Sequence, residues 1–153
     1  MVLELVKVLK ESMDLHISYR INVNEDASEI AELLEKVGAD SIQVTVPSSP
    51  KLFTRESKND ILFDFTDRLS KTLNIPVILG GGLTDMDSIN DLINRTAIDF
   101  VSMQRPFVYN PTFLRDWKAG ISKESECRTC NNCYWKKTST CHIVHDDENC
   151  CGS

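Results

Sequence analysis

Along the first hundred residues, hydrophobic positions recur with two different spacings. Segments with one spacing alternate along the chain with segments that have the other. A spacing of three or four residues between apolar positions predicts a helix, whereas strict alternation predicts a strand. The expected helices cover residues 1–11, 25–38, 59–73 and 83–96, and the expected strands cover residues 16–22, 41–47, 75–82 and 97–103. The chain therefore reads as helix and strand in regular succession, with a loop at 47–58.

The helix at 25–38 carries the clearest start and stop signals. Asp26 is expected as its N-cap, Glu29 occupies the capping-box position, and Gly38 is a typical stop. Thr84 is expected to cap the helix at 83–96. The inward stripes expected for the four helices are Val2, Leu5, Val6 and Leu9; Ile30, Leu33, Leu34 and Val37; Leu62, Phe65 and Leu69; and Met86, Ile89 and Ile93.

Strands that are separated by helices predict a parallel sheet with right-handed crossovers, either in an open sheet or in part of a barrel. The first two strands are apolar on one side only. Their other side carries His16, Ser18, Arg20 and Asn22 in the first strand, and Ser41, Gln43 and Thr45 in the second. A polar inner side that continues to the strand ends is typical of the mouth of a TIM barrel. Closing such a barrel takes about eight strands, so the sequence predicts an α/β fold with half of one.

Net charge and hydropathy exclude several partners. The formal charge is -6 and the pI is about 5.0, which argues against nucleic acid, because a phosphate backbone is bound by clustered Lys and Arg. No apolar run is long enough for a membrane span, and Glu4, Lys7 and Lys10 interrupt the N-terminal segment. We therefore expect a cytoplasmic protein, in which cysteines stay reduced.

Three segments together resemble a known family: "NIPVILGGGLTD", "AIDFVSMQRPFVYNPTFLRDWKAG" and "CRTCNNC". They are similar to the C-terminal half of the Old Yellow Enzyme-type NADH:flavin oxidoreductases, FMN-binding TIM barrels that include trimethylamine dehydrogenase and dienoyl-CoA reductase. The resemblance covers essentially the whole chain. It implies four βα units equivalent to strands five to eight over residues 1–120, followed by a cysteine-rich tail at 121–153.

Glycines after the third strand and an Arg-Pro after the fourth suggest a phosphate site. Phosphates are bound by backbone N–H groups at glycine turns, and in TIM barrels commonly by the loops after strands seven and eight. The resemblance implies that Gly81, Gly82, Gln104 and Arg105 hold the FMN phosphate, with Gln104 at a position where the family often has glycine. The alternative is that the glycines only make a tight turn between strand and helix.

Arg20 lies near the C-terminal end of the first strand, on its polar side. The resemblance implies that it contacts the pyrimidine edge of the flavin, where a fixed cation stabilises negative charge on the reduced ring. The alternative is an exposed arginine in a salt bridge. In the family, the groups that protonate the substrate and hold its carbonyl oxygen come from the first half of the barrel, so no catalytic residue is expected in this chain.

All six cysteines of the chain lie after residue 126. Cys127, Cys130, Cys133 and Cys141 are candidate ligands of a [4Fe-4S] cluster, because thiolates are its usual ligands. The gap before Cys141 is shorter than in cluster-containing relatives, so that Cys150 or Cys151 could be the fourth ligand instead. A zinc site completed by His142 or His145, or thiols without metal, are the alternatives.

Three functional classes follow from these features. The first is an FMN-dependent oxidoreductase that uses NAD(P)H and a small unsaturated substrate, and that is completed by an N-terminal half-barrel chain or by a second copy of this chain. The second is a non-enzymatic module that binds a metal or an iron–sulfur cluster. The third is an inactive remnant that folds without activity.

Overall fold

The computed structural model describes residues 1–46, 55–128, 133 and 141. The chain forms two compact units, which are treated separately below. The first unit comprises Met1–Gly82 and Leu92–Ser102, and the second comprises Leu83–Asp91 and Met103–Ser153. In the part of the chain that the structure describes, no helix combines the length and the apolar character of a membrane span.

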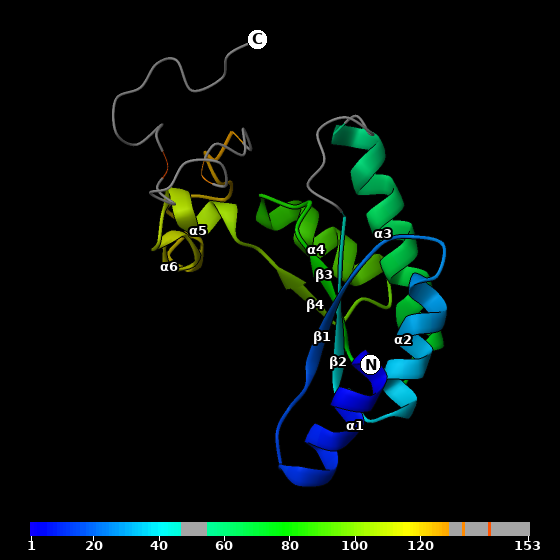
Figure 1. Cartoon of the computed structure of the whole chain (residues 1–153). Coiled ribbons are helices and arrows are strands. Elements are labelled where there is room, and N and C mark those ends of the chain that lie inside the picture. The colour runs from blue at the N-terminus through cyan, green and yellow to red at the C-terminus, as the bar shows by residue number, and fades with distance from the viewer. Residues whose placement is uncertain (47–54, 129–132, 134–140, 142–153) are drawn as a thin grey trace. The chain divides into compact units, whose positions relative to one another are not determined.

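Helices and strands alternate in the order that the sequence predicts (Figure 1). The elements are α1 (Val2–Ser12), β1 (Ser18–Asn22), α2 (Ala27–Lys36), β2 (Ser41–Thr45), α3 (Arg55–Thr72), β3 (Val77–Gly80), α4 (Met86–Arg95), β4 (Phe100–Ser102), α5 (Arg105–Tyr109) and α6 (Phe113–Lys118). The four strands are shorter than expected, and the sequence patterns did not reveal the two short helices α5 and α6.

The four strands form one parallel sheet in the order β1-β2-β3-β4, so each strand lies beside its neighbour in sequence. This order arises when every βα unit crosses over in the same direction, and it is the order found in a barrel. The prediction of an α/β fold built as half a TIM barrel is confirmed. Among the described residues, β1 and β4 form the two edges of the sheet.

One face of the sheet makes the core of the first unit. Its side chains alternate with those of the opposite face, as the pleat requires, and they pack beneath α2 and α3. The buried strand residues are Ile21, Ile42, Val44, Val77 and Leu79, and α3 adds Leu62, Phe65 and Leu69 as predicted.

The remaining helices depart from the predicted stripes. In α2 the buried residues are Ala27, Ala31 and Leu34, whereas Ile30 is 38% exposed. Small alanines give α2 its close approach to the sheet, and the apolar period alone did not reveal this. In α1 only Val6 is buried, whereas Leu5 is 58% exposed. The outer side of α1 therefore has apolar side chains in contact with solvent.

The structure confirms the predicted N-cap position of α2 and corrects that of α4. Asp26 is the N-cap residue of α2 as predicted, although its side chain makes no capping hydrogen bond. The neighbouring Asn24 Oδ1 instead accepts a hydrogen bond from the Asp26 N–H at 3.1 Å. Thr84 is not the cap of α4, because Asp85 directly precedes the helix and its Oδ1 accepts from the Ser88 N–H at 2.7 Å. The predicted stop at Gly38 is confirmed by its φ of +102°.

Carboxylates hold the segments that lead into the strands. Asp40 Oδ2 accepts a hydrogen bond from the Ile17 N–H at 2.7 Å, and Asp99 Oδ2 accepts one from the Val77 N–H at 2.9 Å. Asp40 also forms an ion pair with Lys10 at 2.9 Å. The Ile17 N–H and the Lys10 ammonium lower the pKa of Asp40 below its usual value, because both favour the charged carboxylate.

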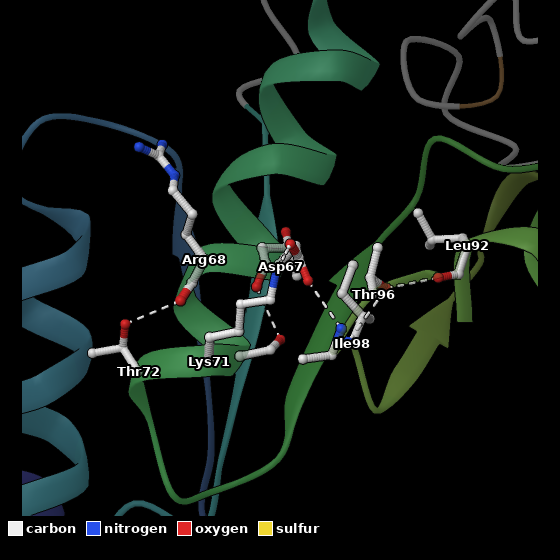
Figure 2. A network of polar contacts seen from close by, with 10 residues as sticks. Asp67, Arg68, Lys71, Thr72, Leu92, Thr96 and Ile98 are labelled. Carbon is white, nitrogen blue, oxygen red and sulfur yellow. Dashed lines mark hydrogen bonds and ion pairs between the residues drawn. The ribbon is translucent and has the colours of Figure 1, made fainter. Parts of the chain in front are cut away.

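Asp67 performs the same task from α3 (Figure 2). Its Oδ1 accepts from the Ala97 N–H at 2.9 Å, and its Oδ2 lies 2.5 Å from Lys71 Nζ. The Lys71 hydrogen bond and then the Ala97 N–H lower the pKa of Asp67. Nearby, Thr96 Oγ1 donates to the Leu92 carbonyl at 2.7 Å and ends α4. These contacts tie α3 to the segment between α4 and β4.

The lowered pKa of Asp67 predicts a stability that depends on pH. A carboxylate with a lower pKa in the folded state stabilises the fold above its unfolded pKa, which is about 3.8 here, and loses this contribution as pH falls through the folded pKa. Asp67→Asn should lower the free energy of unfolding at pH 7 and weaken its decline below about pH 4. Urea unfolding across pH measures this, with Asp64→Asn at an exposed position of α3 as control. An unchanged pH slope in Asp67→Asn would contradict the assignment.

Candidate functional site

The second face of the sheet is the candidate site, and it is called the inner face below. The strand register places its side chains in rows, with Arg20 beside Gln43, Asn22 beside Thr45, and Gly80 beside Ser102. The full inner face consists of Ser18, Arg20, Asn22, Ser41, Gln43, Thr45, Ile78, Gly80, Phe100 and Ser102. The polar side that the sequence predicted for the first two strands is therefore present and continues onto β4.

Arg20 is held by a hydroxyl group on the neighbouring strand. Its Nε donates a hydrogen bond to Thr45 Oγ1 at 3.3 Å. The same hydroxyl lies 2.8 Å from Asn22 Oδ1 and 3.2 Å from the Ile21 carbonyl oxygen. In the described residues, the hydrogen bond of Arg20 is thus made with a hydroxyl group, and its guanidinium belongs to the inner face.

Gln43 extends the polar surface across the sheet. Its Nε2 donates a hydrogen bond to Ser102 Oγ at 2.8 Å, although β3 lies between the two strands. The Gln43 side chain crosses β3 close to Gly80, where an added Cβ would lie in ordinary contact with Gln43 Cγ at 3.5 Å. Two hydrogen-bonded groups therefore share the inner face, one at Arg20 and one at Gln43.

Glycine is favoured at the three consecutive positions 80–82, at the end of β3, for two different structural reasons. A Cβ on Gly80 would lie 2.4 Å from Thr45 Cγ2 and 2.6 Å from the Val44 carbonyl oxygen, so this position has no room for one. Gly81 and Gly82 have φ angles of +95° and +90°, which favour glycine. The backbone therefore favours glycine at positions 81 and 82, and Gly80 has a separate steric role that sequence reasoning did not identify.

The Gly81 amide belongs to the sheet. Its N–H donates to the Ser102 carbonyl oxygen at 2.8 Å, which continues the pairing of β3 with β4. A phosphate bound at this turn would consequently depend on groups other than the Gly81 N–H. Gln104 is the N-cap of α5 in the second unit, and the half-buried Arg105 is the first residue of that helix. The phosphate site of Gly81, Gly82, Gln104 and Arg105 stays a prediction.

Part of the cysteine-rich tail is described within the second unit. Cys127, Cys133 and Cys141 are half-buried, whereas Cys130, Cys150, Cys151, His142 and His145 lie outside the described residues. Within the described ranges, no group of three metal-ligating side chains comes together. The metal site predicted from the sequence is not tested by this arrangement, because Cys130 is one of its proposed ligands.

A hydrogen bond joins α5 to the start of the tail. The Tyr109 hydroxyl donates to Glu126 Oε2 at 2.5 Å. This bond raises the pKa of Tyr109, with further contributions from burial and from the negative charge of Glu126. Phe113 packs edge-on against Phe107 and Trp117 in the same unit, with ring centroids 5.1 Å and 4.0 Å apart. These contacts give the second unit a small core of its own.

Several inner-face residues were not singled out from the sequence. Asn22, Gln43 and Thr45 were seen only as part of a polar side, and Ser102 and Gly80 were not assigned to any site. The alternation of polar residues was the available signal. Their partnerships depend on which strands become neighbours, and this is visible only once the sheet is formed.

Comparison with known proteins places the chain in a family. The dihydrouridine synthase (Dus) family model matches residues 1–146. The imidazole glycerol phosphate synthase subunit HisF of Clostridium botulinum (strain 657 / Type Ba4) is 29% identical over 105 residues, which cover 69% of this chain and 40% of that protein. The bilirubin reductase of Clostridium symbiosum (strain WAL-14163) is 29% identical over 111 residues, covering 66% and 29% of the two chains.

Two further similarities extend over more of the chain. The NADH oxidase of Thermoanaerobacter brockii is 26% identical over 147 residues, which cover 86% of this chain and 22% of the oxidase. A solved structure of 2-naphthoyl-CoA reductase in complex with 2-naphthoyl-CoA superposes with a TM-score of 0.63 at 20% identity, covering 86% and 22% of the two chains. The latter similarity supports the fold. This chain spans 22% to 40% of the length of these proteins.

The space around Gly80 generates a prediction. Gly80→Ala should destabilise the fold by about 1–3 kcal/mol, because its Cβ would overlap the Thr45 methyl and the Val44 carbonyl. Gly81→Ala meets no atom within 4 Å and should be disfavoured only by its positive φ. Replacing Ala by Asn should therefore recover stability at position 81 but not at position 80, since Asn tolerates this backbone conformation. Equal recovery at both positions in urea unfolding would refute the steric role of Gly80.

Proposed function

The chain belongs to the dihydrouridine synthase family, and from this premise we propose that it is the C-terminal half of an FMN-dependent oxidoreductase barrel. The observation that supports this best is the inner face, where Arg20 is fixed by Thr45 among polar side chains at the ends of parallel strands. In TIM barrels, active sites lie at the C-terminal ends of the strands. The more specific assignment to the Old Yellow Enzyme-type oxidoreductases is part of this proposal.

The kind of reaction is supported by the relatives. The bilirubin reductase, the NADH oxidase and the 2-naphthoyl-CoA reductase are oxidoreductases by name. The matched family is a flavin-dependent TIM-barrel family. Because this chain spans at most 40% of these relatives, the activity of a complete enzyme is carried over only as a proposal.

Each proposed binding residue has a defined task. A bound FMN would supply hydride transfer, as flavins do. Arg20 would place its guanidinium at the pyrimidine edge of the ring and stabilise negative charge there. Gly81 and Gly82 would shape the phosphate turn, while Gln104 and Arg105 would contribute a backbone N–H and a positive charge. Substrate protonation would come from the other half of the barrel, so this chain holds cofactor and supplies no catalytic acid.

A small substrate fits the charge of the chain better than RNA does. The family name denotes formation of dihydrouridine, a reduction of a pyrimidine base. The net charge of -6 opposes binding to a nucleic-acid backbone. We propose NAD(P)H as electron donor and a small unsaturated compound as acceptor, in a cytoplasmic enzyme without a membrane or nucleic-acid partner.

The edges of the sheet define the proposed partner. Within the described residues, β1 and β4 each pair with one strand, and exposed strand edges tend to pair with other strands. Beside β1 in sequence, α1 exposes Val2, Leu5 and Val8. Four further βα units would cover these surfaces and close the barrel. They would come from an N-terminal half-barrel chain or from a second copy of this chain.

The cysteine tail supplies a second proposed site. Cys127, Cys130, Cys133 and a fourth ligand, for which Cys141 is the first candidate, would bind a [4Fe-4S] cluster that passes electrons to the flavin. Zinc is the alternative, because thiolates bind both. If the tail binds metal while the sheet binds no flavin, the chain is a metal-binding module. If neither binds, it is an inactive remnant.

Flavin binding tests the proposed function. FMN added to the purified chain should show quenched fluorescence, and Arg20→Met should weaken binding about tenfold, because a hydrogen bond to a charged group is removed. The matched control is Arg68→Met, which removes an exposed arginine from α3. Fluorescence titration gives both affinities. Absence of any signal with the unmodified chain, alone and with an added N-terminal half-barrel, would refute flavin binding.

Metal content tests the proposed tail site. Protein purified without oxygen should contain iron or zinc, and Cys127→Ser, Cys130→Ser and Cys133→Ser should each release it, because each removes a thiolate ligand. Comparing Cys141→Ser with Cys150→Ser and Cys151→Ser identifies the fourth ligand. Elemental analysis and the absorbance spectrum distinguish a cluster from zinc. If the unmodified protein contains neither iron nor zinc, the tail has no metal site.

A further inference from the structure

Thr45 is a buried polar residue of the inner face that lies between Arg20 and Gly80. It is 3% exposed and lies at the end of β2. Its hydroxyl accepts a hydrogen bond from Arg20 Nε and lies within donor distance of two acceptors, Asn22 Oδ1 and the Ile21 carbonyl oxygen. All three partners belong to β1. A hydroxyl has one hydrogen and two acceptor lone pairs, so it can accept from Arg20 while it donates to an oxygen of β1.

The methyl group of Thr45 is fixed as well. It points to the Cα of Gly80, where an added Cβ would lie 2.4 Å from Thr45 Cγ2. A β-branched side chain has few allowed rotamers. With its methyl against Gly80 and its hydroxyl facing β1, Thr45 is held from both sides. The orientation of the Thr45 hydroxyl therefore depends on the absence of a side chain at Gly80.

This arrangement constrains an otherwise mobile side chain. Arg20 is exposed, and a free arginine side chain samples many rotamers. The bond through Nε fixes the plane of the guanidinium, because all its N–H groups are coplanar. It also engages Nε rather than the terminal nitrogens that make paired contacts with a ligand. Thr45 can thus order Arg20 before a ligand arrives.

We propose that Thr45 is a positioning residue, which orients the Arg20 guanidinium toward the edge of a planar ring bearing carbonyl oxygens. The proposal rests on the proposed flavin function and names a residue of the same site that neither motif nor resemblance assigns. Thr45 acts through Arg20 and does not itself need to touch the ligand. Losing its hydroxyl should therefore affect binding only while Arg20 is present.

The first experiment examines Arg20 without any ligand. The hydrogen-exchange rate of the Arg20 Nε–H is measured by NMR in the unmodified chain and in Thr45→Val, which keeps the shape but removes the hydroxyl. The exposed Arg68 provides the reference rate. Exchange at Arg20 should be slower than at Arg68, should rise to the Arg68 rate in Thr45→Val, and should remain slow in Thr45→Ser. Unchanged exchange in Thr45→Val would overturn the proposal. If that variant does not fold, Thr45→Ala takes its place.

The second experiment measures FMN affinity in a double-mutant cycle. Thr45→Val should weaken binding about five- to tenfold in the unmodified background and should have no effect in Arg20→Met, because the hydroxyl acts only through Arg20. Thr45→Ser should restore the affinity. Equal losses in both backgrounds would show that Thr45 does not act through Arg20 and would overturn the proposal. If the unmodified chain binds no FMN, the flavin function fails, while the exchange rates still decide whether Thr45 orders Arg20.

Discussion

A parallel sheet that is covered by helices on one face must leave its other face to solvent or to a partner. In this chain, α2 and α3 cover the face of Ile42, Val44 and Val77, which are fully buried. The opposite face holds Arg20 and a 57% exposed Phe100. Parallel sheets are rarely left open in this way. The exposed Arg20 and Phe100 of the inner face, together with the edge strands β1 and β4 of the described sheet, are the constraint from which the proposed partner and cofactor follow.

The two ends of the strands are built differently. At their N-terminal ends, charged carboxylates such as Asp40 and Asp67 accept backbone N–H groups and link successive βα units. At their C-terminal ends, neutral hydroxyl and amide groups lie near Arg20, and Gly80 makes room for the Thr45 side chain. In TIM barrels, the N-terminal ends of the strands generally serve stability and the C-terminal ends hold the active site. In this chain, Gly80 at the C-terminal end of β3 also contributes to packing.

Sequence periodicity predicted the fold well and the site only partly. Alternation identified the parallel strands and the polar side of β1, because strand geometry requires it. The buried face of α2 was missed because Ala27 and Ala31 are small rather than strongly apolar, and Asp85 rather than Thr84 caps α4. The role of Gly80 depends on a contact with β2, and no local pattern records a contact between residues so far apart in sequence. The tail was recognised by its cysteine spacing and by the resemblance, and three of the six cysteines, Cys130, Cys150 and Cys151, lie outside the described residues.

The central claim is that this sheet is half of a barrel and pairs with further strands. Two copies would supply the required strands if β4 of each paired with β1 of the other. The most direct test is the mass of the purified chain in solution, measured by light scattering at micromolar concentration. The account predicts at least twice the 17.3 kDa of one chain, and a 1:1 complex when an N-terminal half-barrel is supplied. A stable monomer of 17.3 kDa that does not bind the added N-terminal half-barrel would contradict this account.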